Sequence, residues 1–111
     1  MKQSVISFLA GAALVFGQVS LAHAVEEFTL TIKDHKFDPA EITIPANTKV
    51  KLIVKNLDPT PEEFESHKLH REKVIQGNSQ AVIYIGPLGP GSYPFVGEFH
   101  EDTAKGRITV K

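Results

Sequence analysis

Alternating hydrophobic and polar positions dominate the chain from residue 27 onward and predict a series of short β-strands. Phe28, Leu30 and Ile32 share one face of a strand over 27–32, and a second strand covers 50–56 in the same way. The other alternating segments are 42–44, 80–85, the segment with Tyr93 and Phe95, and the segment with Ile108 and Val110. No 3.6-residue period persists after residue 24, so the pattern predicts an all-β sandwich of about seven strands and no helix of ordinary length.

The first 24 residues have the features of a secretory signal peptide. Lys2 supplies a positive charge, residues 5–19 are apolar and uncharged, and Ala22-His23-Ala24 is a small-x-small cleavage signal. The apolar run is shorter than the ~20 residues that a membrane span requires, which argues against an anchor. We therefore expect export to the periplasm, cleavage after Ala24, and one domain over 25–111.

Charge and sulfur content exclude several classes of partner and of metal centre. The chain has 12 basic and 13 acidic residues, with no block of like charge that would suggest nucleic acid or an anionic membrane surface as a partner. It has no Cys, and its one Met is Met1, which the predicted cleavage would remove. A blue-copper centre needs a Cys thiolate and usually a weak axial Met, so this sequence excludes one.

Two segments between the hydrophobic runs, 62–72 and 97–102, concentrate carboxylates and imidazoles. We expect them to be polar loops that together form one acidic face. Loops of this composition, held by strands, are common positions for function. Carboxylate oxygen and imidazole nitrogen suit iron, manganese and Cu(II), which makes a metal site the leading interpretation.

Much of the chain after residue 24 resembles the cupredoxins. The N-terminal half carries the progression Phe37-x-Pro39, Ile42-x-Ile44, a turn, and Val50-x-Leu52-x-Val54-x-Asn56. The C-terminal half carries Pro90-Gly91-Ser92-Tyr93-Pro94-Phe95, a His-bearing loop, and Gly106-Arg107-Ile108-Thr109-Val110. The resemblance implies a cupredoxin-like Greek-key β-sandwich.

The resemblance also implies a ligand set. In cupredoxins the loop before the last strand carries a Cys, a His and often a Met, and here Gly97, His100 and Ala104 stand in those places. Another ligand follows the strand that ends in Asn, and Glu65 matches that place. The implied metal ligands are therefore Glu65 and His100, with Glu98 as the best neighbouring addition.

Other acidic and imidazole residues are weaker candidates. Glu63, His67, His70 and Glu101 come next as ligands. His67 and His70 lie three apart in a stretch expected to be extended, where they would face opposite sides, so each is expected to be a solvated surface residue. His35, in a turn of the other half of the pattern, is expected to be structural. His100, Glu65 and Glu98 also have a plain alternative as ordinary exposed side chains.

The segments Glu-Phe-Glu-Ser and Gly-Glu-Phe-His are similar to those of cupredoxin-like proteins encoded with bacterial iron permeases. This resemblance implies a periplasmic protein that binds copper, iron or both, and that oxidises iron or delivers it to a membrane iron permease and other uptake components. A ferroxidase-type oxidoreductase is the enzyme class it implies. The alternatives are a non-redox copper-binding or storage protein, and a non-metal interaction module on the same scaffold.

Overall fold

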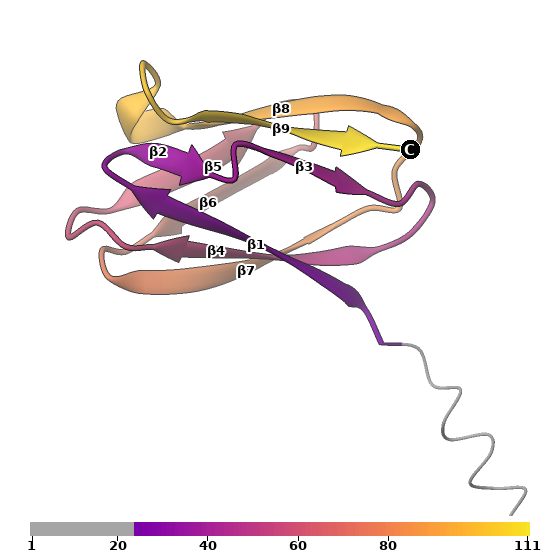
Figure 1. Cartoon of the computed structure of the whole chain (residues 1–111), viewed down its shortest axis with the longest axis horizontal. Coiled ribbons are helices and arrows are strands. Elements are labelled where there is room, and N and C mark those ends of the chain that lie inside the picture. Colours follow the sequence, from indigo (N-terminus) through magenta and orange to yellow (C-terminus); the bar gives the residue numbers. More distant parts are fainter. Residues whose placement is uncertain (1–23) are drawn as a thin grey trace, which may run out of the picture.

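The computed structural model describes residues 24–111, which form nine strands arranged as two sheets packed face to face (Figure 1). The predicted signal peptide lies outside the described residues except for Ala24. The strands are β1 Glu26–Lys33, β2 Lys36–Asp38, β3 Glu41–Ile44, β4 Val50–Asn56, β5 Glu62–Ser66, β6 Arg71–Ile75, β7 Ser79–Ile85, β8 Gly91–Gly97 and β9 Lys105–Val110, and the 3-10 turn η1 Glu98–His100 follows β8.

One sheet has the strand order β2-β1-β4-β7, and the other has the order β3-β9-β8-β5-β6. β1 runs parallel to β4 and β3 runs parallel to β9, while the remaining pairs are antiparallel. The all-β sandwich predicted from the alternation is confirmed. The strand number is higher than expected partly because the segment around Pro39 divides into β2 and β3, which join different sheets.

The alternation also identifies the core correctly. Val50, Leu52 and Val54 of β4 are all buried. They lie on the same inner face of the sheet as Leu30 of the neighbouring strand β1. Each such side chain contributes roughly 1.5–3 kcal/mol when fully removed from water, so these faces fix the register of the sheets.

Three phenylalanines pack together between the two sheets. The ring of Phe95 lies 4.8 Å from that of Phe37 and 5.0 Å from that of Phe64, centroid to centroid. Phe37 belongs to one sheet, and Phe64 and Phe95 belong to the other. This aromatic cluster therefore joins the sheets, and β5 carries one of its three members.

The segment 62–72 is a hairpin rather than a polar loop. β5 alternates strictly, with Glu62, Phe64 and Ser66 buried and the residues between them half-buried. Residues 67–70 form the turn to β6, in which the backbone N–H of His70 donates to the carbonyl oxygen of His67 at 3.1 Å. The expectation of an extended stretch at His67 and His70 is therefore wrong. Four carboxylates in these eleven residues had masked the strand pattern around Phe64.

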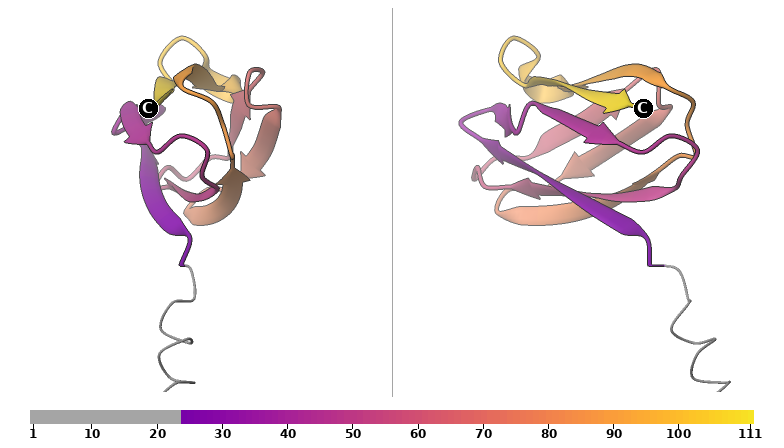
Figure 2. Two further views of the ribbon diagram at one scale, coloured as in Figure 1. Left: turned by 90° about the vertical axis from the view of Figure 1, so that its right-hand side faces the viewer. Right: turned by 45° about the vertical axis from the view of Figure 1, so that its right-hand side comes forward.

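Three connections meet at one end of the sandwich, away from the C-terminus: the β1–β2 turn, the β4–β5 loop and η1 (Figures 1 and 2). The β1–β2 turn has two central residues, Asp34 and His35, both in the left-handed region with φ of 52° and 59°. Two positive φ values are what a tight type I′ hairpin turn requires. Within residues 24–111 we find no helix with the length and apolar character needed to cross a membrane.

Candidate metal centre

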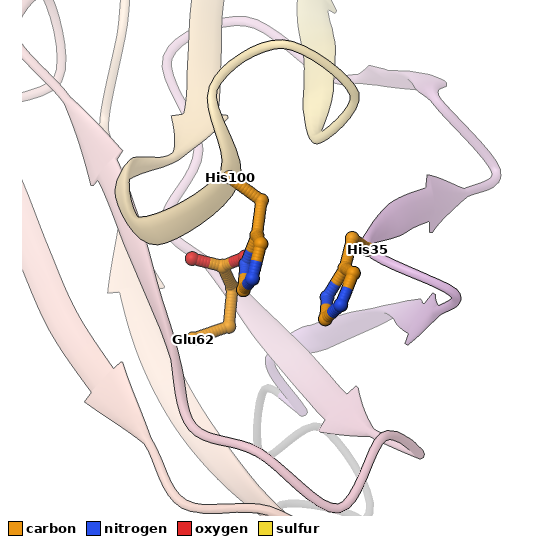
Figure 3. Close-up of side chains that lie close together, drawn as sticks. All are labelled: His35, Glu62 and His100. Carbon is orange, nitrogen blue, oxygen red and sulfur yellow. The ribbon is translucent and has the colours of Figure 1, made fainter.

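His35, Glu62 and His100 come together at this end of the sandwich, each from a different element (Figure 3). His35 lies in the β1–β2 turn, Glu62 is the first residue of β5, and His100 ends η1. Each offers one donor atom, and these atoms all lie within 4.8 Å of one another. Two imidazole nitrogens and a carboxylate oxygen form a donor set that transition-metal ions accept.

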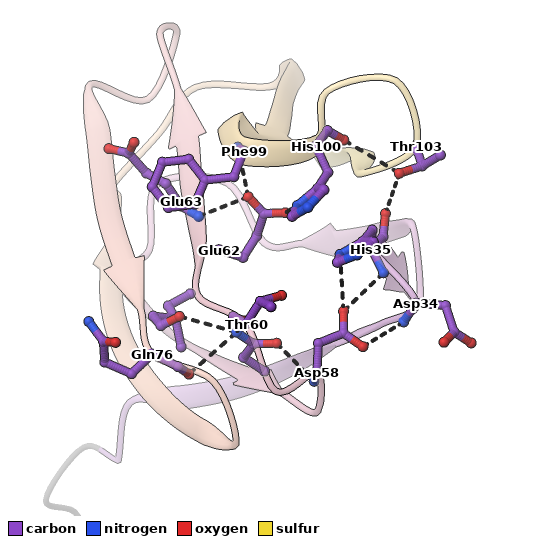
Figure 4. A network of polar contacts seen from close by, with 12 residues as sticks. Asp34, His35, Asp58, Thr60, Glu62, Glu63, Gln76, Phe99, His100 and Thr103 are labelled. Carbon is purple, nitrogen blue, oxygen red and sulfur yellow. Dashed lines mark hydrogen bonds and ion pairs between the residues drawn. The ribbon is translucent and has the colours of Figure 1, made fainter.

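Glu62 is the most constrained of the three. Its side chain is 2% exposed, and its Oε2 lies 2.6 Å from Nδ1 of His100. Its Oε1 accepts the backbone N–H of Phe99 at 2.8 Å and that of Glu63 at 2.9 Å (Figure 4). Hydrogen bonds to a carboxylate are short and strong, so this side chain and the His100 ring are held in one arrangement.

The absence of a side chain at Gly97 leaves room for the Glu62 carboxylate. Gly97 pairs with Phe64, and a Cβ on Gly97 would lie 2.7 Å from Glu62 Cδ and 2.7 Å from Ala104 Cβ. Real Cβ atoms do not approach other heavy atoms so closely. Gly97 matches the position of the cupredoxin Cys, and the Glu62 carboxylate occupies the space that a side chain at this position would need.

His35 lies against the other face of the site. Its ring stacks on the His100 ring with centroids 3.6 Å apart and planes inclined by 13°. The hydroxyl of Thr103 donates to the carbonyl oxygen of His35 at 2.7 Å, which ties the β8–β9 connection to the β1–β2 turn (Figure 4). The turn that carries His35 therefore lies beside His100, and a structural role for His35 stays a prediction next to a role as a ligand.

Asp58, from the β4–β5 loop, holds the turn that carries His35. One carboxylate oxygen accepts the backbone N–H of Asp34 at 2.8 Å, and the other accepts that of His35 at 2.9 Å. Burial alone would raise the pKa of Asp58. The two backbone hydrogen bonds and the nearby His35 and Lys33 outweigh burial, so the pKa of Asp58 is lowered from 3.8.

The predicted ligands divide between two faces of β5. His100 lies in the centre described above, and Glu62 rather than Glu65 is its carboxylate partner. Glu65 lies on the opposite face of β5, where interaction with Glu98 raises its pKa. The ligand roles of Glu65 and Glu98 stay predictions.

The outer face of this sheet carries a group of close carboxylates. Burial, hydrogen bonding with Glu72 and the charge of Glu98 raise the pKa of Glu63 from 4.5 to about 7. Hydrogen bonding with Glu98, together with partial burial, raises the pKa of Glu65. The charge of His67 acts in the opposite direction and lowers this pKa, but it is the smaller effect. Glu63, Glu65 and Glu72 of the hairpin thus share an acidic surface with Glu98 of η1.

Sequence reasoning missed Glu62 and His35. A signal for Glu62 was present, because Glu62, Phe64 and Ser66 alternate and must share a face if Phe64 is in the core. His35 gave no comparable signal. His35 reaches the site because β1 and β2 form a tight hairpin. The local sequence pattern does not show that this turn packs beside His100, which lies 65 residues further along the chain.

Comparisons with known proteins agree with this architecture. Residues 6–110 match the family model described as "Cupredoxin-like domain". The chain belongs to the cupredoxin-like family. It is also 51% identical, over 84 residues, to the Uncharacterized protein RP394 of Rickettsia prowazekii (strain Madrid E), which covers 76% of this chain and 67% of that protein.

Several solved structures are similar in fold at low sequence identity. The metal-binding domain of the Streptococcus pneumoniae D39 Cu(I)-exporting P-type ATPase CopA, solved with Cu(I), has a TM-score of 0.71 at 17% identity and covers 82% of this chain and 90% of that one. Auracyanin A, a "blue" copper protein from Chloroflexus aurantiacus, has a TM-score of 0.67 at 13% identity over 79% of this chain and 100% of that one. At these identities the likeness shows the fold.

The donors in the centre fit a metal ion in type, and the rings limit how one could bind. An imidazole binds a metal in the plane of its ring, and the planes of His35 and His100 are nearly parallel. An ion shared by both residues therefore requires one ring to turn about its side-chain torsions. His35 is the less tightly held ring, because its side chain is 42% exposed and its ring contact with Asp58 is 3.5 Å long, whereas Glu62 holds His100 at 2.6 Å.

Gly97→Ala tests the close packing around Glu62. We expect the added methyl to displace the carboxylate, to break its bond to His100, and to lower the free energy of unfolding by about 1–3 kcal/mol, as overpacking typically does. Urea denaturation and the imidazole ¹⁵N shifts of His100 measure the two effects. Gly89→Ala is the matched control, since nothing lies within 4 Å of its Cβ position. Equal stability of the two variants would contradict the packing argument.

Glu63 should titrate with a pKa of about 7. Glu72→Gln should lower that value, because the amide carries no charge and can donate a hydrogen bond to the ionised Glu63 carboxylate. Carboxyl ¹³C NMR measures both. Because the folded pKa lies above the ordinary value, the folded state favours the proton, and this contribution to stability is lost as pH rises through about 7. Glu41→Gln, on β3 at the far edge of the sheet, is the control and should leave the titration unchanged.

Proposed function

We propose that the protein binds a transition-metal ion, with copper as the first choice, through His35, Glu62 and His100. The observation that carries this proposal is the convergence of their three donor atoms within 4.8 Å. Membership of the cupredoxin-like family supports it, as do two structural neighbours, the Cu(I)-bound domain of CopA and the "blue" copper protein auracyanin A. This donor set contains no sulfur, so the bound state would differ from that of a blue-copper protein.

Oxygen and nitrogen donors favour Cu(II) over Cu(I), whereas thiolate and thioether favour Cu(I). The chain has no Cys, and no Met follows Met1. A Cu(II) form should therefore be pale and lack an intense thiolate-to-copper absorption band. An intense blue colour would refute this donor set.

Replacement of each donor tests the site. We expect Glu62→Gln, His35→Asn and His100→Asn each to weaken Cu(II) binding at least about tenfold, on the order of 1.4 kcal/mol, in isothermal titration. Asn suits position 35 because His35 has φ of 59°, a conformation that Asn tolerates. His70→Asn is the matched control: His70 is exposed, has φ of 56°, and lies in the β5–β6 turn.

Glu65→Gln and Glu98→Gln complete the experiment, because they test the ligands suggested by the family resemblance. If only these two variants lose affinity, the ion binds on the outer face of β5 and not at His35, Glu62 and His100. If no variant changes affinity, the protein is better regarded as an interaction module on a cupredoxin-like scaffold.

We further propose that the protein works in the periplasm and oxidises Fe(II), or delivers iron, beside a membrane iron permease. Bound Cu(II) would supply a one-electron acceptor, giving Cu(I) and Fe(III). The acidic surface supports the proposal, because Glu63, Glu65 and Glu98 gather negative charge next to η1, where it would attract a cationic substrate. The resemblance to proteins encoded with iron permeases is its second support.

Anaerobic mixing of the copper-loaded protein with Fe(II) tests the redox role. We expect one Fe(II) to be oxidised for each Cu(II) reduced. Electron paramagnetic resonance measures the loss of Cu(II), and a ferrous chelator measures the loss of Fe(II). The triple variant Glu63→Gln, Glu65→Gln, Glu98→Gln should slow the reaction, and added salt should slow it in the unmodified protein. If copper stays oxidised and no iron binds, a non-redox copper-binding or storage role is the better account.

A further inference from the structure

Asp58 lies beneath the candidate centre and contacts His35 at both its backbone and its ring. Besides accepting the backbone N–H of His35, its Oδ2 lies 3.5 Å from Nδ1 of the ring. The Asp58 side chain is 8% exposed, whereas that of His35 is 42% exposed. The contact therefore joins a fixed carboxylate to the one ring of the centre that can turn.

Asp58 is itself held rigidly. Its backbone N–H donates to Oδ1 of Asn56 at 3.0 Å, and Nδ2 of Asn56 donates to the carbonyl oxygens of Thr60 and Ile75 at 2.8 and 3.1 Å (Figure 4). Its own carbonyl oxygen accepts the backbone N–H of Asn78. The carboxylate is thus anchored to β4, to the β4–β5 loop and to the β6–β7 connection.

A carboxylate beside one imidazole nitrogen favours a proton on that nitrogen. In the neutral ring, a proton on Nδ1 leaves the lone pair on Nε2, and only a nitrogen with a free lone pair binds a metal. Carboxylate partners of this kind fix the tautomer of metal-binding histidines, and their loss typically lowers metal affinity about 10- to 100-fold.

We propose that Asp58 is the positioning residue of the centre: it holds the β1–β2 turn and keeps the proton of His35 on Nδ1, so that Nε2 is the nitrogen offered to the metal. This inference rests on the proposed metal-binding function, but its statement about the tautomer of His35 holds for the metal-free protein and is tested there.

A double-mutant cycle separates positioning from general support of the fold. Cu(II) affinity is measured for the unmodified protein, Asp58→Asn, His35→Asn and the double variant. We expect Asp58→Asn to weaken binding at least about tenfold in the unmodified protein and less than about twofold when His35 is already Asn. Asp34→Asn is the matched control, because it removes a neighbouring exposed carboxylate and should leave affinity within about twofold.

The tautomer is read from the imidazole ¹⁵N shifts of the metal-free protein at about pH 8, where an ordinary His is neutral. We expect the Nδ1–H form of His35 to predominate in the unmodified protein and in Asp34→Asn, and to lose its predominance in Asp58→Asn.

Predominance of Nε2–H in the unmodified protein would overturn the proposal, as would an equal loss of affinity in both backgrounds of the cycle. If Asp58→Asn does not fold, the tautomer of the unmodified protein decides the question alone. If the unmodified protein binds no Cu(II), the proposed function fails, and the tautomer still shows whether Asp58 orients the ring.

Discussion

The buried carboxylate of Glu62 is the constraint around which this end of the molecule is built. A carboxylate withdrawn from water costs several kcal/mol unless hydrogen bonds replace its hydration. Glu62 obtains them from the backbone of Phe99, from its own neighbour Glu63 and from the ring of His100. Both η1 and the start of β5 must therefore keep their positions for the charge to be tolerated, and Gly97 must stay without a side chain.

A second polar network supports the opposite side of the centre. Asn56 ends β4 and is buried, yet its amide donates to carbonyl oxygens of the β4–β5 loop and of β6, and it also fixes Asp58. Asp58 then holds the tight turn at His35. The two networks meet where the rings of His35 and His100 stack, so the polar groups at this end form a continuous structure rather than a set of separate surface contacts.

Particular elements show why the fold was more predictable than the site. Val50, Leu52 and Val54 revealed β4 directly, because burial on one face leaves an alternating pattern in the sequence. β5 was hidden, since its inward residue Glu62 is a charged group that a hydrophobic pattern does not count. His100 was identified through family resemblance. Its partners were not, because the contacts of Glu62 and His35 depend on strand register and on the packing of one turn against another.

The stacked rings have a consequence for how long an ion would stay. Two of the three donors, Glu62 and His100, are preorganised by short hydrogen bonds, whereas the third must leave its stack before it can take part. Energy spent on that rearrangement is subtracted from the affinity of the complex. It is recovered when the ion departs, because the stack re-forms. With an ion bound as proposed, such a centre would favour rapid exchange of the ion over long retention.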